Sequence, residues 1–198
     1  MSTAAAGDSV AGVELRTARL RLRPMAEADL PAFVAYRRDP DVARYQGWDE
    51  AFSAEDARAL FEKLRGVAPG TPDVWFRFAI EAAAEGTLLG DCVLQVRADD
   101  PRQAEIGFTL APGYQGRGYA AEAVGTLLDY AFTTLGLHRV VAVSDARNAA
   151  AARLLQRVGM RREAHFIQNV WYKGAWGDEL SFAMLRQEWR ERHDGPQG

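Results

Sequence analysis

The sequence predicts a single α/β domain with one sheet of mixed strand direction. Segments with alternating apolar residues are interspersed with segments of helical periodicity, in the order β, α, α, β, β, β, α, β, α, β, β. A chain of 198 residues has the length of one domain, and no internal repeat or linker divides it. We expect a domain over residues 13–192, with a disordered tail at 1–12 and a second tail at 193–198.

Composition excludes several functional classes. The formal net charge of -3 gives no support to a nucleic-acid-binding surface. Cys92 is the only cysteine, so no intramolecular disulfide can form. No apolar run has the length of a signal peptide or a bilayer span, and no spacing of His, Cys and carboxylates suggests a metal site. We therefore expect a cytoplasmic protein that binds no nucleic acid directly, no membrane and no metal.

The first third of the chain is predicted to hold one strand and two helices. Residues 15–25 alternate between apolar and basic side chains, which indicates a half-buried strand. Residues 26–38 have apolar side chains at helical spacing, and Asp39-Pro40 ends this helix. An irregular, aromatic stretch follows over 41–52. The second helix begins at Ser53, in a pattern that resembles a capping box.

Three further strands are predicted next. Residues 75–80 and 88–96 flank a turn with glycine, which indicates an antiparallel hairpin. Trp75 begins the first of these strands, and we expect it to lie in the core together with Cys92. Residues 104–110 alternate in polarity as a third strand. One face of this strand carries Ile106, Phe108 and Leu110, and the other carries Glu105, Gly107 and Thr109.

The rest of the chain is predicted to alternate between helices and strands. An apolar stripe over 120–135 indicates a helix that covers a sheet. A short valine-rich strand at 138–144 follows, and we expect it to be buried on both sides if the preceding helix crosses over the sheet. Asn148 is the predicted cap of the next helix. Two strands at 161–170 and 179–185 and a short amphipathic segment end the domain.

A glycine-rich loop at residues 112–120 is the strongest functional signal. Its sequence is PGYQGRGYA, and three glycines within six residues permit conformations that a Cβ would block. The helix that follows offers unpaired N–H groups and the positive end of its dipole. A strand, a glycine loop and a helix N-terminus together predict a site for a phosphate or pyrophosphate.

The ordered motifs around this loop resemble the GNAT superfamily of acyl-CoA-dependent N-acyltransferases. They are EIGFTL at 105–110, QGRGYA at 115–120, Asn148 and Gly159. More narrowly, the chain is similar to the RimJ/RimL branch, the N-terminal acetyltransferases of ribosomal proteins, through residues 15–23 and a closing Gly-x-Trp-x-Asp at 174–178. The resemblance covers residues 13–189. It implies a mostly antiparallel sheet, flanked by helices, whose central strand pair is splayed.

The resemblance also implies acetyl-CoA as the donor. Main-chain N–H groups of the loop would hold the pyrophosphate of coenzyme A, and these belong to Gln115, Gly116, Arg117, Gly118, Tyr119 and Ala120. Pantetheine would lie in the gap of the splayed pair, bonded to the main chain of Phe108, Thr109 and Leu110. Asn148 would line the pantetheine arm while also capping its helix.

Acetyl transfer to an amine requires a base. An amine attacks a thioester only as the free base, yet an α-amine titrates near 8 and a lysine near 10.4. Glu105 is the candidate base, acting directly or through water, and the alternative is a solvated or salt-bridged strand carboxylate. A main-chain N–H of the splayed strand is the family's donor to the oxyanion.

The proton donor to the departing thiolate is not evident. Much of the superfamily has Tyr at the position of Leu155, and the RimJ/RimL branch often has Ser where this chain has Ala151. Either the attacking ammonium delivers its proton through water, or another hydroxyl serves. The candidates are Tyr45, Ser144 and Tyr172. We expect proximity and oxyanion stabilisation to do most of the work.

Residues outside the cofactor motifs are expected to bind the acceptor. Tyr45 and Trp48 in the aromatic stretch and Trp176 near the end are the candidates. Three functions stay open. The first is acetylation of a protein or peptide N-terminal α-amine, and the second is acylation of a small amine such as a polyamine or aminoglycoside. The third is a non-catalytic CoA-binding regulatory domain. The resemblance also suggests a homodimer.

Overall fold

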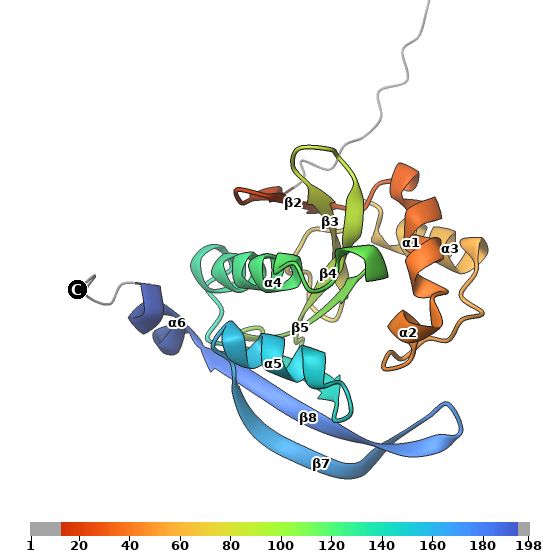
Figure 1. Cartoon of the computed structure of the whole chain (residues 1–198). Coiled ribbons are helices and arrows are strands. Elements are labelled where there is room, and N and C mark those ends of the chain that lie inside the picture. The colour runs from red at the N-terminus through yellow and green to blue at the C-terminus, as the bar shows by residue number, and fades with distance from the viewer. Residues whose placement is uncertain (1–12, 194–198) are drawn as a thin grey trace, which may run out of the picture.

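Eight strands form one sheet in the computed structural model, which describes residues 13–193 (Figure 1). Their order is β1-β2-β3-β4-β5-β6-β8-β7, and every neighbouring pair is antiparallel except β5 and β6. The mixed, mostly antiparallel α/β fold predicted from the sequence is confirmed. The tail predicted at 1–12 and all but His193 of the tail predicted at 193–198 lie outside the described residues. Within 13–193, no helix is both long and apolar enough to cross a bilayer.

The first strand of the prediction is in fact a hairpin. β1 (Leu15–Arg16) and β2 (Leu20–Pro24) pair in antiparallel fashion, so a single strand over 15–25 is wrong. Thr17 explains the turn, because its N–H donates to the Leu20 carbonyl at 2.9 Å and its Oγ1 accepts from the Leu20 N–H at 2.8 Å. A side chain that closes its own local turn competes with a continuous strand.

Three helices lie between β2 and β3. They are α1 (Leu30–Arg37), preceded by the 3₁₀ turn η1 (Glu27–Asp29), then α2 (Pro40–Ala43) and α3 (Ala54–Leu64). The stretch predicted as irregular begins with α2, because Asp39 caps it by accepting from the N–H groups of Asp41 and Val42. The predicted capping box at Ser53 is confirmed. Together these helices cover one face of the sheet (Figure 1).

The central strands are β3 (Phe76–Ala82), β4 (Leu88–Val96) and β5 (Gln103–Leu110). Cys92 is completely buried between them, as predicted. Trp75 is not in the core, because it precedes the first paired residue of β3 and its side chain is 39% exposed.

The glycine loop contains η2 (Pro112–Tyr114) and leads into α4 (Tyr119–Asp129), which ends in the π-helical turn η3 (Tyr130–Thr134). Helix α4 packs on the other face of the sheet and buries its apolar stripe there. β6 (Arg139–Asp145) and α5 (Ala149–Arg157) follow. Burial of this strand on both sides is wrong, because Val140 and Ala142 are buried whereas Val143 on the opposite face is 37% exposed.

A long hairpin ends the fold. β7 (Arg161–Tyr172) and β8 (Ala175–Leu185) are longer than predicted and meet at a two-residue turn, and α6 (Arg186–His193) follows. β7 is an edge strand, and Figure 1 shows the hairpin extending beyond the rest of the sheet. Two register shifts in the hairpin, between Arg162 and Ala164 and between Phe166 and Val170, interrupt its pairing.

The only parallel pair in the described sheet separates partway along its length. β5 and β6 pair from Gln103 opposite Arg139 to Ile106 opposite Ala142, and no further. Beyond that row, β5 continues to pair with β4 as far as Leu110, and β6 continues to pair with β8 as far as Asp145. The splayed strand pair that the family resemblance implies is therefore present.

Candidate active site

A cavity of about 420 Å³ lies at the end of the sheet where β5 and β6 separate. Its walls come from the end of β5, the glycine loop, the first turn of α4 and one side of α5. Nine of the ten predicted cofactor residues line it: Phe108, Thr109, Leu110, Gln115, Gly116, Gly118, Tyr119, Ala120 and Asn148. Arg117 is the predicted cofactor residue that does not line this cavity.

The glycine loop has a conformation that requires glycine at two positions. Gly116 has a φ of 74° and Gly118 has a φ of 82°, both in the left-handed region. Gly118 is also the N-cap of α4, so no side chain caps the first N–H groups of this helix. Gln115 ties the loop to the strand by donating from Nε2 to the Leu110 carbonyl at 3.0 Å. Main-chain N–H groups at an uncapped helix N-terminus are able to bind an anion.

An arginine from the first hairpin holds this loop, and the sequence alone did not reveal it. Arg19 donates from Nη1 to the Arg117 carbonyl at 3.1 Å and from Nε to Glu122 at 2.7 Å. Its guanidinium carbon lies 4.6 Å from the centre of the Tyr119 ring. Thr17 of the same turn donates to Glu122. Because these partners are about a hundred residues away in sequence, local periodicity cannot pair them.

Helix α5 supplies two more cations that sequence reasoning missed. Arg153 and Arg157 line the cavity and are exposed. They lie four residues apart, hence on one face of the helix. This i, i+4 spacing is the sequence signal from which the pair could have been found. Their positive charge suits a ligand that carries phosphate groups.

Asn148 combines the two roles considered for it. Its Oδ1 accepts from the Ala151 N–H at 3.0 Å as the N-cap of α5, and the residue also lines the cavity. Leu155 is 1% exposed and belongs to the core, while Ala151 lines the cavity without an ionisable group. Neither position of α5 can therefore donate a proton.

Glu105 lies in the middle of β5, one residue before the last row that pairs with β6. It is half-buried between Gln95 of β4 and Val141 of β6, on the sheet face opposite α4. Burial raises the pKa of its carboxyl, and the negative charge of Glu179 raises it further, while Arg97 opposes the shift. A carboxylate with a raised pKa beside a strand opening is suited to accept a proton.

The three hydroxyls considered as proton donors have different surroundings. Tyr172 donates to Asp145 and accepts from Arg147 Nη2 at 2.9 Å, and burial followed by the Asp145 hydrogen bond raises its pKa. The Ser144 hydroxyl is buried and has no hydrogen-bond partner within residues 13–193. Tyr45 lines the cofactor cavity. Of the three, only Tyr45 faces this cavity.

The candidate acceptor residues do not meet in one cavity. Tyr45 lines the cofactor cavity, whereas Trp48 packs against α1, donating from Nε1 to the Arg37 carbonyl at 3.2 Å with the Arg37 guanidinium 3.7 Å from its ring. Trp176 is 57% exposed and stands edge to face with Trp171 at 5.4 Å. The hairpin tip nevertheless reaches α2, because the Lys173 ammonium donates to the Ala43 carbonyl.

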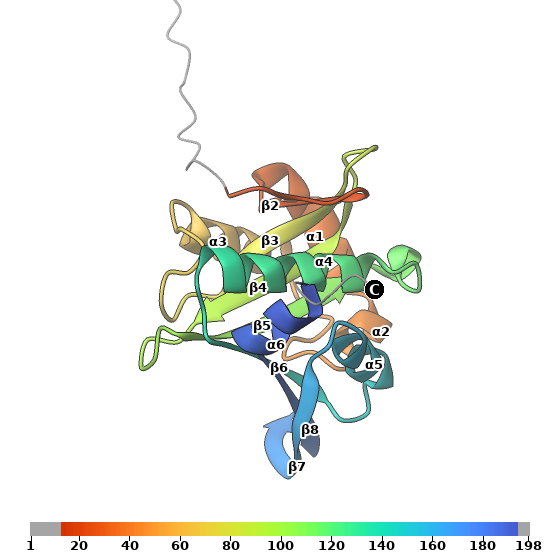
Figure 2. The ribbon, with the colours of Figure 1, turned by 90° about the vertical axis from the view of Figure 1, so that its left-hand side faces the viewer.

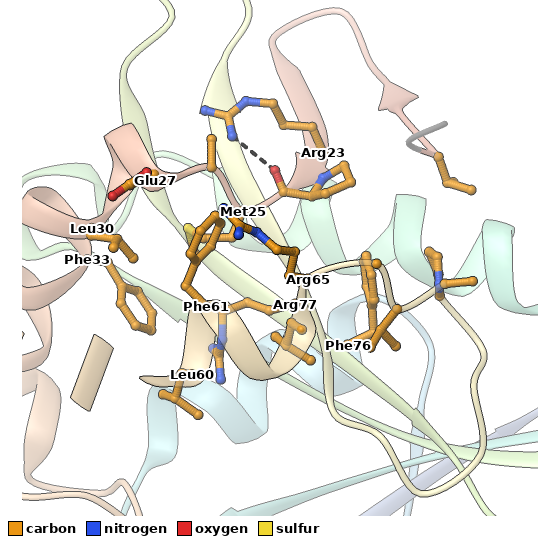
Figure 3. A pocket seen from close by; sticks show the side chains of 18 of the residues that line it. Arg23, Met25, Glu27, Leu30, Phe33, Leu60, Phe61, Arg65, Phe76 and Arg77 are labelled. Atoms are coloured by element: carbon orange, nitrogen blue, oxygen red, sulfur yellow. Dashed lines mark hydrogen bonds between the residues drawn. The ribbon is translucent and has the colours of Figure 1, made fainter. Parts of the chain in front are cut away.

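A second, larger cavity lies elsewhere, and none of the predicted site residues lines it (Figure 3). It opens near α3, and Figure 2 shows α3 and the loop that precedes α4 at opposite ends of α4. Within residues 13–193, no group of three or more His, Cys, Asp or Glu side chains is arranged to hold a metal ion.

Comparison with known proteins agrees with this geometry. Residues 19–161 match the family described as the acetyltransferase (GNAT) domain. The uncharacterized N-acetyltransferase YnaD of Bacillus subtilis (strain 168) is 32% identical over 177 residues, which cover 89% of this chain and 99% of that protein. The spermidine N(1)-acetyltransferase of Vibrio cholerae is 29% identical over 93 residues, 47% of this chain and 54% of that protein.

A solved structure extends the match to three dimensions. The acetyltransferase (GNAT family) from Bacillus anthracis superposes with a TM-score of 0.78 at 30% identity, covering 88% of this chain and 99% of that one. The family match spans most of the domain, including β2, the splayed strands and the glycine loop. The chain therefore belongs to the GNAT family and is an acetyl-CoA-dependent N-acetyltransferase.

Proposed function

We propose that this enzyme acetylates the N-terminal α-amine of a protein or peptide, in the manner of the RimJ/RimL branch, with Glu105 as the base. The observation that carries the proposal is the position of Glu105. It lies beside the opening of the splayed strands, on the face that α4 does not cover, and burial raises the pKa of its carboxyl. Because an α-amine titrates near 8, well below a lysine, a carboxylate relay can deprotonate it near neutral pH.

The cofactor occupies the 420 Å³ cavity in this proposal. Main-chain N–H groups of residues 115–120 hold the pyrophosphate, and Arg153 and Arg157 neutralise phosphate charge from the α5 side. Pantetheine runs along residues 108–110 with Asn148 on its other side. Support comes from the lining of the cavity, which brings these segments together.

The reaction then proceeds in a ternary complex. The amine nitrogen attacks the thioester carbonyl carbon, and a main-chain N–H of residues 108–110 stabilises the oxyanion. The nitrogen loses a proton to Glu105 through water. The carbon–sulfur bond breaks, and the thiolate of coenzyme A takes a proton from water or from Tyr45, the one candidate hydroxyl that lines the cavity. The products are the N-acetyl amine and free coenzyme A.

The exposed hairpin favours a peptide acceptor. Phe166, Ile167 and Trp171 on β7 and Trp176 on β8 are 47% to 65% exposed. Such a surface beside an edge strand can hold the residues of an extended chain. The same surface could form the interface of the homodimer that the family resemblance suggests. Sedimentation of the wild-type protein tests for this dimer.

A small polyamine is the second candidate acceptor. Glu105 and Glu179 place negative charge near the strand opening, and negative charge attracts a polycation. The Vibrio cholerae relative acts on spermidine, according to its name. The two acceptors require different binding sites, because only a polyamine needs several carboxylates along its length.

Turnover measurements decide between these acceptors. We expect acetyl-CoA to release free thiol with a panel of N-terminal peptides, and mass spectrometry to place the acetyl group on the α-amine. Spermidine, spermine and an aminoglycoside form the comparison arm. Faster turnover of a polyamine than of every peptide would replace the first acceptor by the second. Coenzyme A binding without turnover of any acceptor would overturn both.

A further inference from the structure

The second cavity has a volume of about 640 Å³, within the usual range for small-molecule sites. It lies between α1, α3, the end of β2 and the start of β3 (Figure 3). Strand register separates it from the cofactor site. Phe76 in its wall shares a row with Leu94 and Ile106, whereas the cofactor residue Leu110 is four residues farther along β5, or about 13 Å.

The walls of this cavity are mainly apolar. Helices α1 and α3 contribute aliphatic and aromatic side chains, and β3 closes one side with Phe76. Figure 3 labels some of the apolar side chains around the cavity: Met25, Leu30, Phe33, Leu60, Phe61 and Phe76. An apolar ligand body that fills such a space gains free energy from the surface it removes from water.

The negative charges of the lining are already neutralised. Glu27 pairs with Arg58 at 2.8 Å, and Glu14 pairs with Arg16. Arg23 is likewise occupied, since it pairs with both Asp29 and Glu81. Neither carboxylate of the lining, Glu14 or Glu27, is therefore left without a cationic partner.

Two cations of the lining are incompletely paired. Arg77 pairs through Nη1 with Asp91, which also accepts from Tyr36, and its buried Nε has no hydrogen-bond partner within residues 13–193. Its guanidinium carbon lies 5.2 Å from the centre of the Phe33 ring. Arg65 is exposed at the rim, and its contact with Glu62 is 3.4 Å long. The lining carries three guanidinium groups, those of Arg23, Arg65 and Arg77, against the two carboxylates of Glu14 and Glu27.

We propose that this cavity is a second ligand site, separate from the cofactor and acceptor sites, for a small carboxylic acid with an apolar body. The body fills the space between α1, α3 and Phe76. The carboxylate binds the exposed guanidinium of Arg65 at the rim, which can hold a carboxylate as a planar donor. This site does not depend on which amine the enzyme acetylates.

Titration calorimetry with decanoate tests the site, at concentrations below those at which it forms micelles. Decylamine and decanol are matched probes that share the chain but not the charge. We expect decanoate to bind saturably, with one site per chain, and about tenfold more tightly than either probe. Saturation with coenzyme A should leave this affinity unchanged, because the two cavities are separate.

Variants locate the binding in the cavity. Leu60→Trp fills the space and should weaken decanoate binding by about tenfold or more. Ala59→Trp places the same side chain on an exposed position of α3 outside the lining and should change nothing. Arg65→Glu, at an exposed position, should weaken binding by about fivefold. Circular dichroism confirms that each variant is folded.

Four outcomes would overturn the proposal. They are the absence of saturable decanoate binding, equal affinity for decylamine, displacement of decanoate by coenzyme A, and unchanged affinity in Arg65→Glu. The last variant keeps the test decisive if Leu60→Trp does not fold.

Discussion

The two ends of the proposed reaction path are built differently. The cofactor end is made of main chain: two glycines with positive φ, an uncapped helix N-terminus and two strands that separate. The residues predicted to bind the acceptor, Tyr45, Trp48 and Trp176, come from distant elements and do not share a cavity. A site that binds acetyl-CoA through its main chain needs glycines at fixed positions, which form a recognisable motif in the sequence. A site that binds the acceptor through side chains of distant elements needs no such local motif.

Gly118→Val tests the cofactor end with the largest expected effect. Valine strongly disfavours a φ of 82°, and a strained residue costs about 1–3 kcal/mol, so coenzyme A should bind about a hundredfold more weakly. The affinity is measured by calorimetry on protein whose fold is verified by circular dichroism.

Gly113→Val is the matched control. Gly113 lies in the same loop without a positive φ, and a Cβ there would meet no atom within 4 Å. Its affinity for coenzyme A should be close to that of the wild type. Unchanged affinity in Gly118→Val would refute the assignment of the loop to the pyrophosphate.

Glu105→Gln tests the chemistry between the two ends. Loss of the base should lower kcat by about thirtyfold, because proximity and the oxyanion donor still act. Acetyl-CoA affinity should not change, since Glu105 does not line the cofactor cavity. A fall of several orders of magnitude in a folded variant would contradict the view that no single side chain is indispensable.

Arg19→Ala tests whether a side chain stabilises the main-chain site. Without its bonds to the Arg117 carbonyl and Glu122, the loop loses a support, and coenzyme A should bind about fivefold more weakly. Arg16→Ala removes an exposed arginine from the same hairpin and is the control. Arg19→Lys should restore little, because lysine cannot form both bonds and stack on Tyr119. If all three variants bind coenzyme A with equal affinity, Arg19 does not support the cofactor loop.

Sequence patterns predicted most of the fold because most elements carry local signals. The Ser53 capping box, the Asn148 N-cap and the apolar stripe of α4 each appear where the sequence places them. The errors arose where a side chain acts over a short turn or where neighbours decide burial. Thr17 divides one expected strand into two, and Val143 of β6 is exposed on the face opposite the buried Val140 and Ala142.

The residues predicted to bind the cofactor were found from local motifs, and nine of them line one cavity. Arg19 was not, because its partners lie about a hundred residues away. The second cavity was also invisible, because α1, α3 and β3 form its walls only after folding. Long-range pairs of side chains form only in the tertiary structure, and no local sequence pattern indicates them.

Glu179→Gln has the smallest expected effect and tests the acceptor face. The charge of Glu179 raises the pKa of Glu105, and the base works only when deprotonated, so activity should rise with pH through this pKa. Removing the charge lowers the pKa and should move the acidic limb of kcat/KM down by a few tenths of a pH unit. The profile is measured from about pH 4 to 7, around and above the ordinary glutamate value.

Arg97→Gln supplies a control of opposite sign. Arg97 lowers the pKa of Glu105, so its removal should move the same limb to higher pH. A general loss of stability would move both variants in one direction, whereas charge acting on one base moves them apart. If neither variant moves the limb, the group that titrates in the profile is not Glu105, and the base must be sought among the other side chains around the strand opening.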